Sequence, residues 1–255
     1  MNVTVCELPH DPGPRDEAWE GLVEHCRAAR SDIVLLPEMP FSVWLAATKE
    51  VDETRWADAV TAHEIWLGRL DELGAGTVLG SRPVVVEGRR HNEAFAWKSG
   101  TYLPSHHKYY LPDEDGFWEA TWYDRGTGRF PTLDTALGKV GFLVCTEVWF
   151  TEHARSFGRD GVTIVANPRA TEWSSRDKWL AGGRAAAVMA GAFCLSSNHS
   201  GIDALGMRWG GLGWIIDPDG EVLATTSEEE SFVTVTVDPL DADRAKVTYP
   251  RYVEE

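Results

Sequence analysis

The sequence predicts a layered α/β protein, and three observations indicate this class. Short apolar runs of strand type recur along the whole chain, segments with helical spacing separate several of them, and two pairs of runs look like antiparallel hairpins. The 255 residues contain no internal repeat, low-complexity tract or Pro/Ser-rich linker. We therefore expect one domain over residues 1–240, and an irregular, polar tail over 241–255 that packs on a partner subunit or frays.

The expected elements follow from the local pattern of apolar residues. Each strand is a short apolar run, and the first helix carries Trp19, Leu22, Val23 and Cys26 on one face. In order, the elements are strand 3–8, helix 15–30, strand 32–38, helix 52–73, strands 77–86, 92–97, 139–145 and 162–168, helix 176–191, and strands 192–198, 213–217 and 231–238. Hairpins are expected in "VVVEGRRHNEAFAW" and at the turn "DPDG" (217–220).

The charge of the chain argues against one broad class of function. A net charge of −16 and a pI near 4.9 provide no clustered Lys and Arg for binding phosphates, so no nucleic-acid partner is expected. The acidity serves solubility, or else favours a cationic substrate by steering. The start "MNVTVCELPHDPGP" lacks the basic and apolar regions of a secretory signal, and no apolar run approaches the roughly 20 residues of a membrane span. A cytoplasmic location without membrane association is expected.

The four cysteines are widely scattered and contain no C-x-x-C pair, which predicts reduced thiols rather than a disulfide framework or a zinc cluster. Cys6, Cys26 and Cys194 lie inside apolar patterns and are expected to be core residues. Cys145 differs, because the apolar strand "KVGFLVC" ends on it and turns at once into polar residues. It is either a buried small hydrophobic residue or a nucleophile exposed at a strand end beside a base.

Two other strand ends carry candidate functional residues. The strand "IVLLP" runs into Glu38. Glu38 is either a structural acid, at the surface or at a helix N-cap, or a partly desolvated carboxylate that acts as a general base. Lys108 opens the loop "KYYLPDEDGFWEATWYDRG", dense in aromatic and acidic residues, and is either solvated or part of a site. Adjacent His106 and His107 are not expected to share a metal ion, because neighbours on a strand point to opposite faces.

Together, these segments resemble the carbon–nitrogen hydrolase (nitrilase) superfamily. "LLPEMPF" is similar to its Leu-x-Pro-Glu segment, "HKYYLPD" to its lysine loop and "KVGFLVCTEVWFTE" to its cysteine elbow. "RAAAVMAGAFCLSSNHSG" and "GWIIDPDGEVLA" resemble the helix and strand that end in Asn-x-x-Gly and the closing hairpin. The resemblance spans roughly residues 3–240 in the family's order. It implies a four-layer αββα sandwich, at least a homodimer, and no metal or organic cofactor.

The resemblance also implies the roles of the site residues. Cys145 is the nucleophile that forms an acyl-thioester, Glu38 the acid and base, and Lys108 the cation that stabilises the oxyanion together with the Thr146 N–H. The lysine loop is similar to that of N-carbamoylputrescine amidohydrolases and related amidases. By that correspondence Glu119 is the additional glutamate, with Glu114 as the competing candidate.

A primary amide or an N-carbamoyl amine is the substrate that the resemblance favours, with a nitrile as the alternative. A non-catalytic small-molecule-binding protein and a redox thiol protein are the hypotheses from other classes. The expected substrate contacts or pocket walls, each with ordinary packing as its alternative, are Trp149, Trp118, Tyr123, Phe41, Trp44 and Trp173. Asn198 is expected to be structural. Thr146 and Glu147 replace the family's usual aromatic-Asp pair after the cysteine, and "YDRG" and "GLGW" are further departures, so an unusual substrate preference is expected.

Overall fold

Two neighbouring strands show how the layers form. In the computed structural model, which describes residues 1–135 and 138–253, β1 (Asn2–Pro9) lies parallel to β2 (Ile33–Leu35). Val3 and Val5 pack on one face of β1 against other strands, whereas Cys6 and Leu8 pack on the opposite face against helices. A strand that is apolar on both faces has to lie in an inner layer of the protein.

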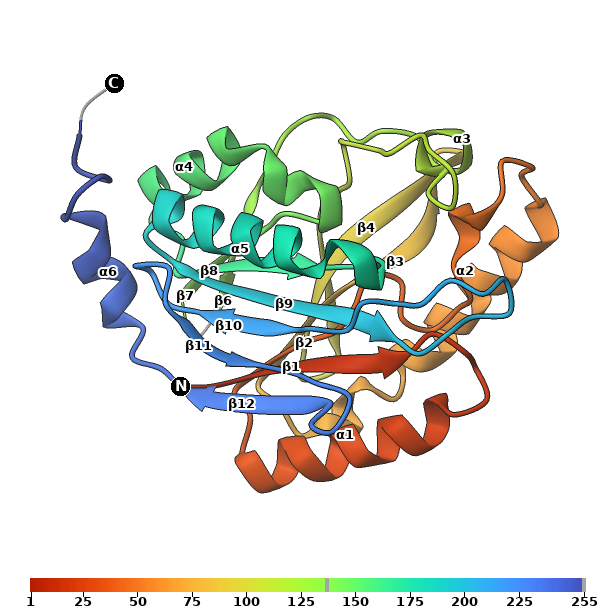
Figure 1. Ribbon diagram of the computed structural model, residues 1–255, viewed down its shortest axis with the longest axis horizontal. Helices are drawn as coiled ribbons and strands as arrows, with labels where there is room; N and C mark the ends of the chain where they lie inside the picture. Colours follow the sequence, from red (N-terminus) through yellow and green to blue (C-terminus); the bar gives the residue numbers. More distant parts are fainter. Residues whose placement is uncertain (136–137, 254–255) are drawn as a thin grey trace.

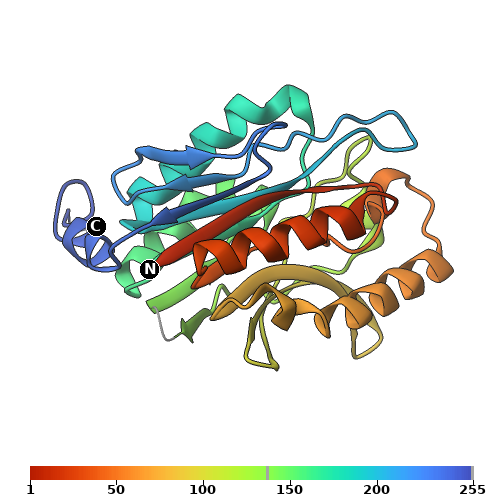
Figure 2. The same ribbon diagram turned by 90° about the horizontal axis from the view of Figure 1, so that it is seen from below.

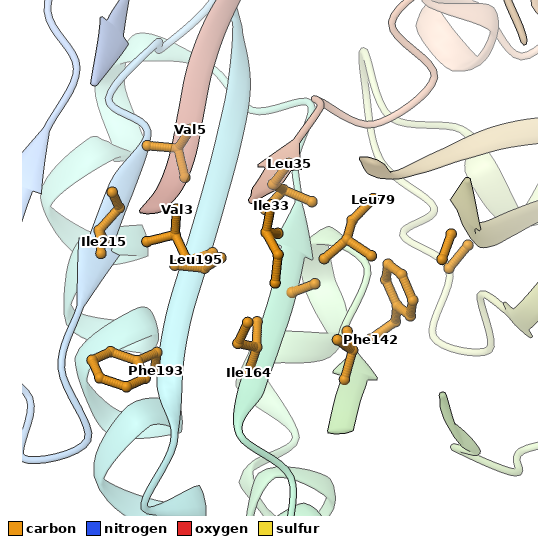
Figure 3. Packing of buried hydrophobic residues seen from close by; sticks show 14 of the residues in the cluster. Val3, Val5, Ile33, Leu35, Leu79, Phe142, Ile164, Phe193, Leu195 and Ile215 are labelled. Atoms are coloured by element: carbon orange, nitrogen blue, oxygen red, sulfur yellow. The ribbon is translucent and has the colours of Figure 1, made fainter. Parts of the chain in front are cut away.

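The strands form a continuous sheet whose two halves pack face to face. The first half consists of β5 (Thr101–His107), β4 (Arg89–Lys98), β3 (Thr77–Val86), β2, β1 and β12 (Phe232–Thr236). The second half consists of β6 (Thr132–Thr135), β7 (Gly138–Phe142), β8 (Ile164–Pro168), β9 (Phe193–Ser200), β10 (Trp214–Ile216) and β11 (Val222–Thr225). Pairing of β1 with β9 joins the halves. Figure 3 shows side chains from both halves meeting in the core between them.

Helices cover the outer face of each half. On the first half lie α1 (Arg15–Ala29) and α2 (Glu53–Leu67), and on the second lie α4 (Thr151–Arg159) and α5 (Arg176–Ala190), as Figures 1 and 2 show. Trp19 and Leu22 of α1 and Ala186 and Ala190 of α5 fill the two cores between helices and strands. The order helix, sheet, sheet, helix confirms the predicted αββα sandwich.

The direction of the strands decides where the site lies. Each neighbouring pair in the series β7, β8, β9, β1, β2 and β3 is parallel, and β5 shares this direction because β4 is antiparallel to both β3 and β5. The carboxyl ends of β2, β5 and β7 therefore lie on the same side of the molecule. Glu38, Lys108 and Cys145 each follow one of these ends closely, and parallel strands conventionally present ligand sites there.

Most of the expected elements are present, and the two predicted hairpins are confirmed as β3–β4 and β10–β11. The C-terminal segment differs, because it begins with the helix α6 (Leu240–Lys246), which buries Ala242 and Ala245. The helix expected over 52–73 ends at Leu67, and the separate turn η2 (Leu70–Leu73) follows it. Short helical turns that the apolar pattern does not predict are η1 (Leu45–Ala47), α3 (Glu119–Trp122), η3 (Cys145–Trp149) and η4 (Trp173–Ser175). Within the described ranges, no helix combines the length and apolar character needed to cross a membrane.

Candidate active site

A buried cluster of one ammonium and two carboxyl groups lies at the carboxyl ends of the strands. Lys108 Nζ lies 2.8 Å from Glu38 Oε1, and 2.8 and 2.7 Å from the two carboxyl oxygens of Glu119. All three side chains are excluded from solvent. Burial alone lowers the pKa of Lys108, but the Glu119 and Glu38 carboxylates more than offset this and raise it above its ordinary value. Lys108 is therefore a fixed positive charge.

Main-chain and side-chain contacts fix Glu38 from several sides. Its N–H donates to Arg169 O at 3.2 Å, and its carbonyl accepts from His199 Nε2 at 2.7 Å. Asn92 Nδ2 donates to Oε1 at 2.7 Å, so Oε1 accepts from both Asn92 and Lys108. Oε2 has no hydrogen-bond partner in the part of the chain that the structure describes. One oxygen is thus held in place while the other remains able to accept a proton.

Glu119 begins α3, which is fastened to the loop around η1. Trp44 Nε1 donates to Gly116 O at 2.9 Å, and the Trp118 N–H donates to Ala46 O at 2.8 Å. Burial raises the pKa of Glu119; the Lys108 ammonium opposes this and the Glu38 carboxylate adds to it, and the resulting pKa is about 8. Glu119 therefore holds its proton more tightly than an ordinary glutamate does. Glu114, the competing candidate, is exposed and has no contact with Lys108 in the structure.

Cys145 occupies a strained backbone position at the start of η3. Its φ of 48° is in the left-handed region, which non-glycine residues seldom adopt. Asn167, on β8, donates from Nδ2 to Leu143 O at 2.5 Å and to Cys145 O at 3.2 Å, so the neighbouring strand holds the turn in this shape. The turn keeps Cys145 packed on the core between the sheets while the residue also lines a cavity. It also places the Thr146 N–H in the first turn of η3, where backbone donors lack an intrahelical acceptor.

The thiol of Cys145 is neutral in the resting protein. Burial raises its pKa well above the ordinary value, the Glu38 carboxylate adds to this, and the Lys108 ammonium opposes it. The Sγ lies 3.9 Å from Ala170 O. A nucleophile in this environment needs a base to remove its proton during attack, because the thiolate is not formed in advance.

Cys145 and Glu119 open onto a cavity of about 350 Å³. Thr146 and Trp149 line it. The remaining lining residues are Pro112, Glu114, Phe117, Ala170, Thr171, Glu172, Ser175, Lys178 and Trp179. Larger cavities elsewhere on the surface, of about 540 and 690 Å³, contain none of the clustered residues. The chemistry therefore places the site at the smaller cavity.

Comparison with known proteins identifies the family. The profile of the Carbon-nitrogen hydrolase family matches residues 2–246. The chain belongs to the carbon–nitrogen hydrolase family. It is 24% identical to N-carbamoylputrescine amidase of Arabidopsis thaliana over 250 residues, which cover 90% of this chain and 82% of that protein. It is 26% identical to deaminated glutathione amidase of Synechocystis over 240 residues, which cover 89% and 86% of the two chains.

A solved structure shares the fold of this carbon–nitrogen hydrolase. The crystal structure of carbon-nitrogen hydrolase from Helicobacter pylori G27 matches with a TM-score of 0.87 at 19% identity. The match covers 99% of this chain and 94% of that one. The αββα arrangement is thus the fold of a known member of the same family.

Several aromatic residues predicted as pocket walls of the hydrolase lie elsewhere. Phe41 is buried in the helix-side core, where it stacks on Trp66 at 4.6 Å. Trp173 lies outside the cavity between the guanidinium groups of Arg176 and Arg208, 3.3 and 3.5 Å from its ring centroid. The sequence indicates aromatic character near the site, but which face of a loop an aromatic occupies is set by packing of distant segments.

Three more of these aromatics belong to the cluster behind the cavity. Trp44, Trp118 and Tyr123 pack around Met39 and Trp122, and none of the three lines the cavity. The Tyr123 hydroxyl is buried and has no hydrogen-bond partner among the described residues. Burial and the nearby Glu119 and Glu38 charges raise its pKa well above the ordinary value. Tyr123 therefore lies close to the carboxyl cluster and does not form a wall of the cavity.

The hydrolase site also contains residues that the sequence analysis missed. Phe117 and Trp179 form the aromatic walls, and Lys178 and Glu172 place charges in the lining. Ala170 and Thr171 follow the end of β8, so the strand-end argument used for Cys145 would have found them. Asn92 and Asn167 lie within strands, where the apolar pattern gives no sign of a polar role.

The other three cysteines and Asn198 lie in structural positions. Cys6, Cys26 and Cys194 are buried free thiols in the helix-side cores, away from Cys145 in the core between the sheets. Asn198 is structural, because it donates to Gly211 O at 2.8 Å and accepts from the Thr171 N–H at 3.0 Å. Among the described residues, no group of three or more His, Cys, Asp or Glu side chains is arranged to hold a metal ion.

Proposed function

We propose that this family member is a thiol hydrolase that cleaves a non-peptide C–N bond of a small amide or N-carbamoyl amine. The observation that carries the proposal is the buried Glu38–Lys108–Glu119 cluster beside a cavity lined by Cys145. It supplies a proton acceptor, a fixed cation and a thiol, which are the groups that acyl transfer requires.

In the first half of the reaction, Cys145 Sγ attacks the carbonyl carbon of the substrate. The free Glu38 Oε2 accepts the thiol proton, since Oε1 is already occupied by Lys108 and Asn92. The carbonyl oxygen becomes an oxyanion, which the Lys108 ammonium and the Thr146 N–H stabilise. Collapse of this tetrahedral intermediate breaks the C–N bond, and the departing amine takes the proton back from Glu38. The products are the free amine and a thioester on Cys145.

In the second half, a water molecule attacks the thioester and Glu38 takes a proton from it. Collapse of the second intermediate breaks the C–S bond and returns that proton to the thiolate of Cys145. An amide substrate gives a carboxylic acid, whereas an N-carbamoyl amine gives carbamic acid, which decomposes to carbon dioxide and ammonia. Both oxygens of Glu119 lie against Lys108 Nζ and hold the cation in place, which leaves the free Oε2 of Glu38 as the proton carrier.

The cavity favours a small substrate with a polar far end. Its volume of about 350 Å³ is near the lower limit for ligand sites. Glu114, Glu172 and Lys178 place charges of both signs in the lining, and Phe117, Trp149 and Trp179 provide apolar surface for a short linker. The amidase names of the two relatives described above support an amide or N-carbamoyl group over a nitrile.

The first test is intact-mass spectrometry and ammonia release with a panel of small amides, N-carbamoyl amines and nitriles. Wild type is expected to release ammonia and to show a mass adduct on Cys145 that identifies the acyl group. Cys145→Ala should abolish both without unfolding the protein. Cys26→Ala is the matched control, because Cys26 is a buried thiol of the α1 core and its removal should leave turnover intact.

The alternative functions predict different results in the same experiment. Full turnover by Cys145→Ala would exclude the thioester route. Saturable binding without an adduct or ammonia would favour the non-catalytic binding protein. A redox role requires a resolving cysteine, and the other cysteines are buried in separate cores.

We also propose that the C-terminal segment packs on a second copy of the chain. In Figure 1 the segment from α6 onward extends beyond the sandwich. It leaves large apolar side chains exposed, with Val247 and Tyr249 76% and 74% accessible. Light scattering of the full chain should give a homodimer or higher homo-oligomer, and removal of residues 247–255 should shift it toward the monomer. A monomeric full chain would contradict this proposal.

A further inference from the structure

One buried carboxylate connects the segment of Lys108 to the segment of Cys145. Glu147 lies two residues after the nucleophile and is excluded from solvent. Its Oε2 accepts from the Val144 N–H at 2.8 Å, just before Cys145. Its Oε1 accepts from the Tyr109 N–H at 2.7 Å, just after Lys108. The residues that flank the cation and the nucleophile are thus hydrogen-bonded to the same side chain.

The partner of this carboxylate is His106, whose two ring nitrogens both face acceptors. Nε2 lies 2.9 Å from each carboxylate oxygen of Glu147, and Nδ1 lies 3.1 Å from Arg129 O. A backbone carbonyl only accepts, so Nδ1 must carry a proton. Both oxygens of Glu147 also accept from backbone amides, and Nε2 lies equally close to the two of them, the geometry of an N–H shared between two carboxylate oxygens. An imidazole that donates from both nitrogens is a cation.

We propose that Glu147 and His106 form a buried ion pair that positions Lys108 and Cys145 relative to each other. This inference rests on the proposed function for its effect on turnover. Lys108 follows β5 in one half of the sheet and Cys145 follows β7 in the other. The pair joins the two segments directly across the space between the halves. Neither residue touches the substrate cavity, so both are positioning residues.

The pair also explains how the strained turn is maintained. Cys145 has a left-handed backbone, and the Asn167 amide holds its carbonyl on one side. Glu147 holds the preceding Val144 N–H on the other side. In the proposed pair the His106 cation is the counter-charge of the Glu147 carboxylate, whose two oxygens each accept one backbone N–H. A neutral amide at position 147 has only one acceptor oxygen and can satisfy only one of the two backbone N–H groups.

The surroundings contain further titratable groups that interact with the pair. Burial is the main cause of the raised pKa values of Tyr110 and Glu119, and Glu147 adds to both. Glu147 also raises the pKa of His153 of α4, whereas His106 lowers it. The Phe130 ring packs on His106 at 4.4 Å and separates it from His153, which stacks on Phe130 at 3.6 Å. His106 therefore has Glu147 as its one ion-pair partner among the described residues.

The adjacent residue provides a matched control. His107 Nε2 forms a hydrogen bond with Glu93 Oε2 at 2.8 Å, on the opposite face of β5. That pair is partly exposed and does not contact the turn at Cys145. His107→Gln therefore removes an imidazole ring from the His107–Glu93 pair, one position along the strand from His106, and leaves the His106–Glu147 pair in place.

The first arm of the test uses no substrate. In ¹⁵N-histidine-labelled protein at pH 7, the His106 ring should show two protonated nitrogens, and Glu147→Gln should convert it to a ring with one unprotonated nitrogen. Hydrogen exchange should then speed up at both Tyr109 and Val144 in Glu147→Gln, and at neither residue in His107→Gln. A neutral His106 ring in the wild type would overturn the proposed ion pair, whatever the protein's substrate.

The second arm measures kinetics with a substrate found in the panel described above. Glu147→Gln should lower kcat about 100-fold with little change in KM, because misplacement of catalytic groups costs on this scale. His106→Gln should lower kcat about tenfold, and the double variant should be no worse than Glu147→Gln, since the two residues act as a unit. His107→Gln should retain wild-type turnover. Additive losses in the double variant, or a Glu147→Gln enzyme with wild-type kcat, would overturn the positioning role.

Discussion

At the scale of single residues, Lys108 has two roles that one substitution can separate. It is the cation proposed for the oxyanion, and it is also the counter-charge for Glu38 and Glu119 in a solvent-free site. Lys108→Met keeps the shape of the side chain and removes the charge. The catalytic role predicts a loss of kcat of about 100-fold or more. The structural role predicts a loss of stability that depends on pH.

The sign of that dependence follows from the two carboxyl groups. Without the cation they take up protons in the folded state more readily than in the unfolded state. Their contribution to stability is then fully present below the unfolded pKa of about 4.3 and is lost as pH rises. Lys108→Met should therefore be much less stable than wild type at pH 7, with the difference narrowing at pH 5. Urea unfolding at both pH values measures this, and a difference independent of pH would contradict it.

The residues that sequence analysis identified share one property. Glu38, Lys108 and Cys145 each interrupt an apolar pattern at the end of a strand, and strand direction brings those ends together. Asn92, Asn167 and Glu147 give no such signal, because their roles depend on partners in segments that are distant in sequence. The pattern thus predicts which residues meet but not which residues hold them there.

At the scale of elements, the same distinction applies to helices and strands. The helices α1 and α5 were predicted within one residue of their observed ends, since their pattern repeats over several turns, whereas the helix predicted over 52–73 ends at Leu67. Short turns such as η3 and α3 were not, although they carry Cys145 and Glu119. Residues distant in sequence hold these turns, Asn167 at η3 and Ala46 at α3, which is tertiary rather than local information.

Two adjacent glycines in α5 provide a prediction about this packing. A Cβ at Gly182 would lie 2.8 Å from the ring of Trp149, and one at Gly183 would lie 2.7 Å from the ring of Trp214. Trp149 is 39% exposed and lines the cavity, so it can move, whereas Trp214 is fully buried. Gly182→Ala should change KM across a series of substrates of increasing size while stability stays close to wild type.

Gly183→Ala should instead destabilise the protein by about 1–3 kcal/mol, the usual cost of overpacking a core, with less effect on substrate preference. Urea unfolding and KM measurements on both variants test the pair together. Equal loss of stability in the two variants would show that Trp149 is as firmly held as Trp214, and would contradict the idea of an adjustable cavity wall.

At the scale of the whole molecule, the site forms only where the two halves of the sheet meet. Glu38 and Lys108 follow strands of the first half, and Cys145 follows a strand of the second half. The β1–β9 pairing and the core between the sheets fix this arrangement. The resemblance of the sequence to a known family implied this architecture, while the apolar pattern alone indicated only alternating strands and helices.

Buried histidines near Glu38 make this arrangement sensitive to acid. Burial lowers the pKa of His10 to about 4 and of His63 to about 3, and it lowers that of His199 well below its ordinary value. Two of these rings accept hydrogen bonds from backbone amides: His10 Nε2 from the Trp44 N–H at 2.7 Å and His63 Nε2 from the Phe41 N–H at 3.3 Å. Protonation of either nitrogen would place two donors face to face.

The protein should therefore lose stability as pH falls below about 6.5, the ordinary pKa of histidine in the unfolded chain. Above that pH the rings are neutral in both states, so their contribution is fully present. As the pH falls from 6.5 toward the folded-state pKa values, the unfolded state binds protons that the folded state does not. At pH 5 this costs on the order of 2 kcal/mol for each fully neutral ring.

His63→Gln isolates one of these contributions. The Gln side chain retains a donor for Ala59 O and an acceptor for the Phe41 N–H but does not titrate in this range. Urea unfolding between pH 7.5 and 5 should show the variant losing about 2 kcal/mol less than wild type over this interval, whatever its stability at pH 7.5. A constant offset between the two curves would mean that His63 takes up its proton equally in both states. The acid sensitivity would then lie outside His63.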